Sequence, residues 1–183
     1  MEKTGYGLVI TGISGGGKTT VAAEIKKRHP HLSQGLRMTV RKPRPGEIHG
    51  VHYEFLNEDE LRNLHKQGEL LYFEEWYGSM YAMRKKPVYE KLSNGEHILI
   101  ETIVPAAFKL HREPNMRVVF LVTKDDETMI KRLKNRGEEE KEIQERLKYA
   151  QIERKMGQDL GVFTIINDDL ENTIKEVEKF FLS

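Results

Sequence analysis

The sequence predicts an α/β fold, a parallel sheet flanked by helices, and three observations support it. A glycine-rich loop lies near the start of the chain, four apolar runs alternate with helical periodicity, and two insertions interrupt the alternation. The runs have the length of strands and cover residues 8–11, 97–100, 118–122 and 163–166. Strands that alternate with helices in this way form parallel sheets covered on both faces.

The glycine-rich loop is the most specific feature of the chain. Residues 12–19 fit the phosphate-binding pattern G-x-x-x-x-G-K-[ST] and directly follow an apolar run. Its glycines let several backbone N–H groups converge on a triphosphate, Lys18 can reach the terminal phosphates, and Thr19 can offer a hydroxyl to Mg²⁺. We therefore expect the chain to bind a nucleoside triphosphate through Gly12, Ser14, Gly15, Gly16, Gly17, Lys18, Thr19 and Thr20.

Length and composition exclude several classes of protein. The chain has 183 residues, a formal net charge of +1 and no cysteine, which fits one domain without disulfides or general attraction to nucleic acid. No apolar stretch approaches the roughly 20 residues of a membrane span, and Met1-Glu2-Lys3 lacks a secretory apolar region. We expect a cytoplasmic monomer or homodimer with no nucleic-acid or membrane partner.

Two helices are predicted to cover the sheet. One begins near Thr20 and the other ends the chain; their inward-facing residues are Val21, Ala22 and Ile25, and Ile174, Val177 and Phe181. A capping box, Asp168 followed by Glu171, is predicted to start the last helix.

The first insertion, residues 37–88, should bind a phosphate. It contains a short helix that begins at residues 57–60 and a hairpin over 71–83 that turns at Gly78-Ser79. Its loop spaces Arg41 and Arg44 three apart on a chain stiffened by prolines, which suits two guanidinium groups on one phosphate. Tyr53 and Tyr81 could add hydrogen bonds, although a solvated loop with two core tyrosines is the alternative.

The second insertion, residues 123–157, should be mostly helical. Its inward face is Ile143, Leu147 and Ala150, and its arginines Arg132, Arg136 and Arg146 would face the phosphates from outside. The core of the single domain then comprises residues 1–36, 89–122 and 158–183.

Six segments, in this order and at these spacings, resemble the guanylate kinase family over nearly the whole chain. They are residues 13–15, 39–47, 50–55, 78–81, 132–137 and 167–170. The resemblance implies a P-loop core, a nucleoside-monophosphate-binding (NMP-binding) insertion and a helical lid. It also implies transfer of the γ-phosphoryl group of ATP, with Mg²⁺, to a nucleoside 5′-monophosphate.

The same resemblance assigns roles to particular residues. The acceptor phosphate would be held by Arg41, Arg44, Tyr53 and Tyr81. The transferring group would be neutralised by Lys18, Arg132, Arg136 and Arg146. Glu101 matches an aspartate near the acceptor and the metal, and Asn167 lies where the family contacts the adenine end of ATP.

Four positions that read guanine in the family carry other residues here. They are Arg37, Tyr72, Met83 and Ile103, in place of a serine, a glutamate, a second serine and an aspartate. Guanine presents N–H donors that require an acceptor such as a carboxylate, whereas Arg37 offers donors only. We therefore expect a changed or broadened base specificity.

Other readings stay open. The chain could be an ordinary GMP or dGMP kinase in which Glu74 or Glu75 replaces the missing carboxylate, or a kinase of the same mechanism for a modified nucleotide or a non-nucleotide phosphate ester. It could also be a non-catalytic domain that binds a phosphorylated protein, which the intact P-loop disfavours. No metal is expected at His29, His31, His49 or His52, because none lies in a ligand-like cluster.

Overall fold

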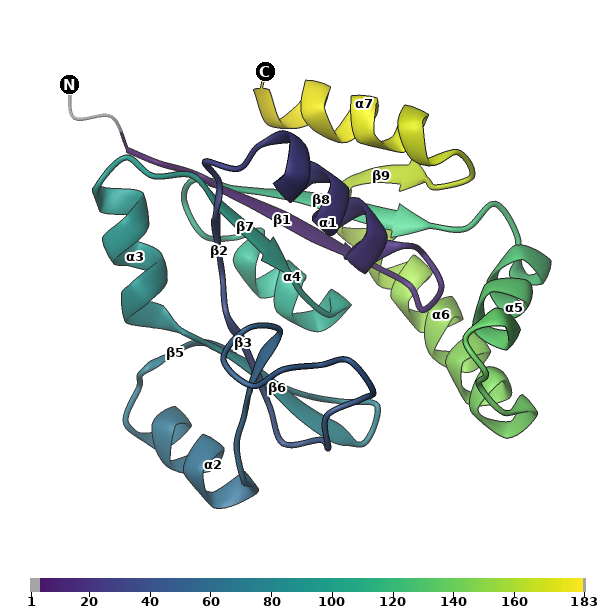
Figure 1. Ribbon diagram of the computed structural model, residues 1–183, viewed down its shortest axis with the longest axis horizontal. Coiled ribbons are helices and arrows are strands. Elements are labelled where there is room, and N and C mark those ends of the chain that lie inside the picture. The colour runs from purple at the N-terminus through teal and green to yellow at the C-terminus, as the bar shows by residue number, and fades with distance from the viewer. Residues whose placement is uncertain (1–3, 183) are drawn as a thin grey trace.

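The computed structural model describes residues 4–182 and confirms the predicted α/β class (Figure 1). Met1-Glu2-Lys3 and residue 183 lie outside the described residues. A central sheet holds five parallel strands in the order β2-β7-β1-β8-β9. Their bounds are β1 (Gly7–Gly12), β2 (Ser33–Gln34), β7 (Ile98–Glu101), β8 (Met116–Val122) and β9 (Phe163–Ile166). The four predicted runs are thus strands, and only the two-residue β2 was not anticipated.

Alternation along the central strands separates two apolar cores. Leu8 and Ile10 of β1 face the core that contains α1 (Lys18–Arg28) and α7 (Leu170–Leu182), and Figure 1 shows these two helices on one side of the sheet. Val9 faces the other core, which is closed by α3 (Lys85–Ser93), α4 (Val104–Leu110), α5 (Asp126–Asn135) and α6 (Glu140–Leu160). Both faces of the sheet are therefore buried, as expected for parallel strands.

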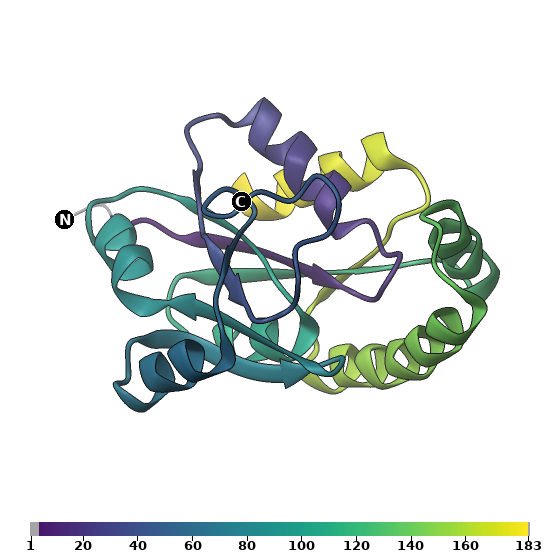
Figure 2. The same cartoon turned by 60° about the horizontal axis from the view of Figure 1, so that its bottom comes forward.

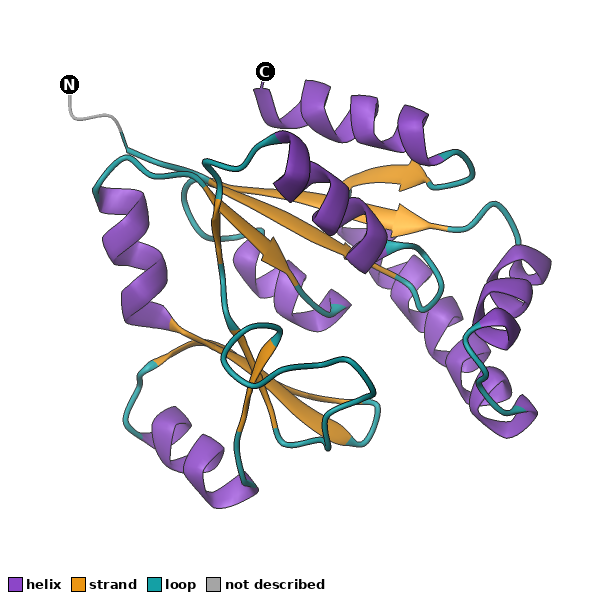
Figure 3. Cartoon of the chain, in the orientation of Figure 1, coloured by secondary structure: helices purple, strands orange, loops and turns teal. Residues whose placement is uncertain are grey.

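A smaller sheet forms a separate layer, seen below the central sheet in Figure 3. Its order is β4-β3-β6-β5, with bounds β3 (Arg37–Thr39), β4 (Tyr53–Phe55), β5 (Leu70–Trp76) and β6 (Ser79–Arg84). It packs against α2 (Glu58–Lys66) around Met38, Leu61, Met80 and Ala82. The capping box of α2, Asn57 with Glu60, holds the predicted helix start.

The hairpin of the smaller sheet turns one residue earlier than predicted. Ser79 already pairs with Trp76 in the ladder, so the turn consists of Tyr77 and Gly78. Their φ angles are +52° and +64°. Positive φ at both central residues is the geometry of the tight turn that matches the twist of two antiparallel strands. Glycine adopts this conformation freely, but a tyrosine there is strained.

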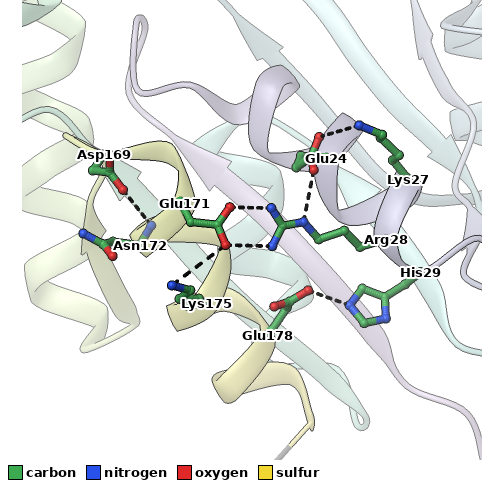
Figure 4. Close-up of polar contacts among 9 residues, drawn as sticks. All are labelled: Glu24, Lys27, Arg28, His29, Asp169, Glu171, Asn172, Lys175 and Glu178. Carbon is green, nitrogen blue, oxygen red and sulfur yellow. Dashed lines mark hydrogen bonds and ion pairs between the residues drawn. The ribbon is translucent and has the colours of Figure 1, made fainter.

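The α1–α7 interface carries polar contacts at its edge (Figure 4). Arg28 donates to both carboxylate oxygens of Glu171, at 3.2 and 2.5 Å. The Asp169 carboxylate accepts from the Asn172 N–H at 2.8 Å, one residue later than the predicted cap at Asp168. Asp168 instead pairs with Lys124 at 3.3 Å. The predicted capping box is therefore wrong, because the second of two adjacent acids occupies the cap position.

Within the described residues, no helix combines the length and the apolar character needed to cross a membrane.

We expect Gly157→Ala to destabilise the fold. A Cβ at Gly157 would lie 2.6 Å from Phe120 Cε1, and Phe120 is fully enclosed in the core. Overpacking of this kind costs about 1–3 kcal/mol, which outweighs the gain of about 1 kcal/mol in helix propensity. Urea denaturation should show a lower free energy of unfolding, while the exposed neighbour Gln158→Ala should not. A variant as stable as wild type would contradict the tight α6–β8 contact.

Candidate active site

A cavity of about 230 Å³ lies where the glycine-rich loop, the smaller sheet and α6 meet. The structure brings most of the predicted residues to it: Ser14, Gly15, Gly17, Lys18, Thr19, Arg37, Arg41, Arg44, Tyr53, Tyr72, Tyr81, Glu101, Arg136 and Arg146. An adjoining hollow, which shares Gly15, Gly17 and Arg136, is lined by Thr20, Arg132 and Asn167. Met83 does not line the cavity, because its side chain is buried in the core.

The glycine-rich loop curls against β8 and leads into α1. Gly17 has a φ of +90°, and a Cβ there would lie 2.1 Å from Asn167 Nδ2, so only glycine fits. Asn167 Nδ2 donates to the Gly16 carbonyl at 2.8 Å, and its Oδ1 accepts from Thr173 at 3.0 Å. The helix begins at Lys18, two residues earlier than predicted. Asn167 therefore braces the loop directly at the start of α1.

Lys18 is half-buried at the base of the loop. Its Nζ donates to the carbonyls of Gly12 and Ile13 at 2.7 and 3.0 Å. Burial lowers the pKa of this ammonium group from its usual value, and the carboxylates of Glu153 and Glu101 oppose the shift.

The predicted lid arginines reach the same loop from the other side. Arg132 donates to the carbonyls of Gly15 and Asn167 at 3.1 and 2.7 Å. Arg146 on α6 donates to the Ser14 hydroxyl at 3.1 Å and forms an ion pair with Glu138. These arginines are thus already directed at the loop that the sequence assigns to phosphate.

The proline-stiffened loop holds its arginines through one carboxylate. Glu47 accepts both guanidinium N–H groups of Arg41, each at 2.6 Å, and the backbone N–H of Arg44 at 2.8 Å. Burial alone would raise the pKa of Glu47, but these hydrogen bonds outweigh it and lower the pKa to about 2. The Arg41 guanidinium also lies 4.9 Å from the centre of the Tyr53 ring. Glu47 therefore holds Arg41 and the backbone of the loop in place, a role that the sequence analysis missed, and the anion clamp itself stays a prediction.

Glu101, at the end of β7, joins the glycine-rich loop to the smaller sheet. Its Oε1 accepts from the Thr19 hydroxyl at 2.8 Å and pairs with Arg37 Nη1 at 3.1 Å. The Arg37 guanidinium in turn lies 4.2 Å from the centre of the Tyr53 ring. One carboxylate thus touches both halves of the cavity.

The whole chain was compared with known proteins. A family model described as "Guanylate kinase" matches residues 5–183. The chain belongs to the guanylate kinase family. It is therefore a nucleoside monophosphate kinase, as the sequence predicts. A guanylate kinase of Synechococcus sp. (strain CC9311) is 38% identical over 173 residues, 93% of this chain and 90% of that protein. A guanylate kinase of Streptomyces coelicolor is 36% identical, over 92% of this chain and 86% of that protein.

Solved structures agree on the fold. The crystal structure of guanylate kinase from Anaplasma phagocytophilum superposes with a TM-score of 0.81 at 22% identity, over 99% of this chain and 86% of that chain. Shikimate kinase from Acinetobacter baumannii gives a TM-score of 0.53 at 16% identity, over 98% and 94%. At these identities the likeness shows the fold alone.

The four positions that the sequence analysis matched to guanine-reading residues lie in one wall of the cavity and in the core behind it. Arg37, Tyr72 and Ile103 line the cavity, and Met83 packs behind them. The Tyr72 hydroxyl accepts from Thr102 Oγ1 at 2.9 Å, and its ring is almost fully buried. Burial raises the pKa of this phenol, so it stays neutral.

Neither proposed replacement for the missing carboxylate reaches the cavity. Glu74 pairs with Lys109 at 2.5 Å and Glu75 with Arg62 at 2.9 Å, and neither lines the cavity. Alternate residues of a strand point to opposite faces, so carboxylates that follow Tyr72 by two and three positions cannot both reach the place that Tyr72 occupies.

Two further residues at the site were given no role in the sequence analysis. Tyr77 lines the cavity from the hairpin turn, and Glu153 on α6 is buried beside it. Glu153 lies two helical turns after Arg146 and thus on the same face, which is a usable signal. The backbone strain that places Tyr77 has no sequence signature.

We expect the Arg41–Glu47 pair to make stability depend on pH in the acid range. The folded pKa of Glu47, about 2, lies below its ordinary 4.5. Its stabilisation is therefore complete above about pH 4.5 and fades as the pH falls toward 2. The difference in free energy of unfolding between wild type and Glu47→Gln should shrink over this range in urea titrations. In an Arg41→Ala background that pH dependence should weaken, because only the contacts with Arg44 then lower the pKa of Glu47; an undiminished pH dependence would contradict the pairing.

Proposed function

We propose that the protein transfers the γ-phosphoryl group of ATP to a nucleoside 5′-monophosphate and that its base preference differs from that of guanylate kinases. A phosphate oxygen of the acceptor attacks the γ-phosphorus, the bond to the β-phosphate oxygen breaks, and ADP leaves. Such a reaction requires alignment and charge neutralisation far more than covalent help. The single observation that carries the proposal is the convergence of the P-loop lysine, the lid arginines and the Arg41 clamp on one cavity.

Each half of the cavity would bind one of the two substrates. Lys18, with Arg136 and Arg146, would hold the terminal phosphates of ATP, and the hollow beside Asn167 would take the adenine end. The acceptor phosphate would lie between Arg41, Arg44 and the two tyrosines, Tyr53 and Tyr81. Arg132 would steady the loop, because it donates to the Gly15 carbonyl of the loop and to the carbonyl of Asn167, which braces the loop.

Thr19 and Glu101 fit the Mg²⁺ that the family implies. Their side chains offer a hydroxyl and a carboxylate 2.8 Å apart beside the phosphate loop, and both are hard oxygen donors of the kind Mg²⁺ prefers. When bound, the ion supplies positive charge for the transferring phosphoryl group. Glu101 would meanwhile keep Thr19 and Arg37 in place.

The changed base preference rests on the wall built by Arg37 and Tyr72. Guanine needs acceptors for its ring N–H and exocyclic amine, but the Tyr72 hydroxyl already accepts from Thr102, and Oε1 of Glu101 already binds Thr19 and Arg37, so Glu101 offers one oxygen for two groups of donors. Each unmatched donor costs about 1–3 kcal/mol. Arg37 would instead favour a base edge that presents acceptors, such as a pyrimidine carbonyl.

The second candidate is an ordinary GMP or dGMP kinase. The relatives named above are called guanylate kinases, so the comparisons favour this candidate and give no support to a changed base. Arg37 could also meet guanine O6 and N7, which are both acceptors. A modified nucleotide or a non-nucleotide phosphate ester would use the same clamp. A non-catalytic phospho-ligand module is disfavoured, because it would not require the lysine and arginines of the donor side.

Three further expectations remain predictions. They are the cytoplasmic location, the monomeric or homodimeric state, and the division into a core, an NMP-binding insertion over residues 37–88 and a lid over residues 123–157.

We expect an acceptor panel to rank another monophosphate above GMP. ATP-to-ADP turnover with Mg²⁺ should be measured over ribo- and deoxyribonucleoside monophosphates, modified bases included, with products identified by mass. One unmatched guanine donor should lower kcat/KM for GMP by about tenfold or more relative to the preferred acceptor. Lys18→Ala serves as the blank. The highest kcat/KM on GMP or dGMP would instead establish the second candidate.

We expect Arg41→Ala to weaken every acceptor to a similar degree. The variant removes a charge-assisted contact to the phosphate, worth about 1.5–3 kcal/mol, so the acceptor KM should rise roughly 10- to 100-fold regardless of base. Lys42→Ala is the matched control, because Lys42 is an exposed cation of the same loop that does not line the cavity. An unchanged acceptor KM in Arg41→Ala would remove the clamp from the proposal.

A further inference from the structure

Glu153 is a buried carboxylate that the phosphoryl-transfer scheme does not use. It lies on α6 with only 2% of its surface exposed. Its Oε1 accepts from Trp76 Nε1 at 3.1 Å and from the Tyr77 hydroxyl at 3.0 Å. Its Oε2 has no hydrogen-bond partner among the described residues. Trp76 and Tyr77 form the tip of the β5–β6 hairpin, which reaches α6 in Figure 2. We call these three residues the hairpin–lid contact.

The hairpin–lid contact is built onto the phosphate loop. Tyr77 lines the cavity together with Ser14, whose hydroxyl accepts from Arg146 at 3.1 Å. The centres of the Tyr77 and Tyr149 rings are 4.4 Å apart. The Cζ atom of Arg146 lies 5.8 Å from the centre of the Tyr77 ring. Strained residues persist where their surroundings hold them, and Tyr77 is held by Tyr149 and Glu153.

The smaller sheet connects the hairpin–lid contact to the residues of the acceptor side. Tyr81 lies on β6, and β6 pairs directly with β3, from which the arginine loop departs. The orientation of the hairpin tip against α6 therefore sets where the acceptor clamp lies relative to Arg146. Misalignment of reacting groups by about 1 Å can cost on the order of 100-fold in rate.

We propose that Glu153 is a positioning residue: through Trp76 and Tyr77 it fastens the acceptor-binding hairpin to the lid helix and so aligns the acceptor phosphate with the phosphate loop. The carboxylate sits near Lys18, whose charge opposes the rise in the pKa of Glu153 that burial causes. Burial outweighs this effect and the pKa stays raised, while the hydrogen bonds of Glu153 go to the acceptor side. Glu153 therefore interacts with residues of both halves of the cavity.

Tyr77→Phe is the mildest test, because it removes one hydroxyl and keeps the ring. We expect kcat to fall about 10- to 100-fold with the best acceptor of the panel, and the acceptor KM to rise more than the KM for ATP. Tyr89→Phe is the matched control, because the Tyr89 hydroxyl donates to Glu113 at 2.6 Å and does not line the cavity. Kinetics that match those of Tyr89→Phe would overturn the proposal.

Glu153→Gln tests the charge while it keeps an oxygen acceptor and the side-chain volume. Trp76 is the sole tryptophan of the chain, so its emission reports the hairpin–lid contact without any substrate. We expect a shifted emission maximum and a lower kcat, while Glu145→Gln, an exposed change on the same helix, alters neither. A lower melting temperature with unchanged emission and unchanged kcat would show a purely structural carboxylate. Because the emission needs no acceptor, failure of the base-preference proposal leaves this result interpretable.

Discussion

Repulsion among like charges is the constraint on which the site depends. The cavity of about 230 Å³ is lined by one lysine and five arginines, which are Lys18, Arg37, Arg41, Arg44, Arg136 and Arg146. Carboxylates hold several of them: Glu47 binds Arg41, Glu101 binds Arg37 and Glu138 binds Arg146. Each pair fixes a guanidinium whose remaining donors can turn toward an anion. The cations are therefore arranged before a phosphate arrives, and the arrangement does not require reorganisation during the reaction.

Phosphate recognition and base recognition are separable in this arrangement. Arg41, paired with Glu47, lines the cavity from the proline-stiffened loop, whereas Arg37 and Tyr72 line it from β3 and β5. A change at the wall can alter the acceptor without a change in the chemistry. Under the proposed function, that separation would let a chain that is 38% identical to a guanylate kinase prefer another base.

The sequence predicted the parts of the structure that follow from local rules. The loop over residues 12–19, the four long core strands and the inward faces of α1 and α7 follow from motif and periodicity. Two errors, at Asp168 and at Gly78-Ser79, were displacements of one residue, because adjacent residues of similar type compete for a cap or a turn. The pairing of Arg37 with Glu101 could not be predicted from the sequence, since it joins two elements that are distant in the chain and that only the fold brings together.

Glu153 illustrates why a residue of this kind is hard to predict and informative once seen. A buried carboxylate is unfavourable unless it is paired, and an apolar residue of similar size is often as stable at such a position. One oxygen of Glu153 is shared by two donors and the other has no partner among the described residues. Packing alone would favour leucine or glutamine there. What distinguishes the carboxylate is that its hydrogen bonds hold the hairpin tip, while the charge of Lys18 opposes the rise in its pKa that burial causes. The residue makes physical sense only as a link between the two halves of the cavity.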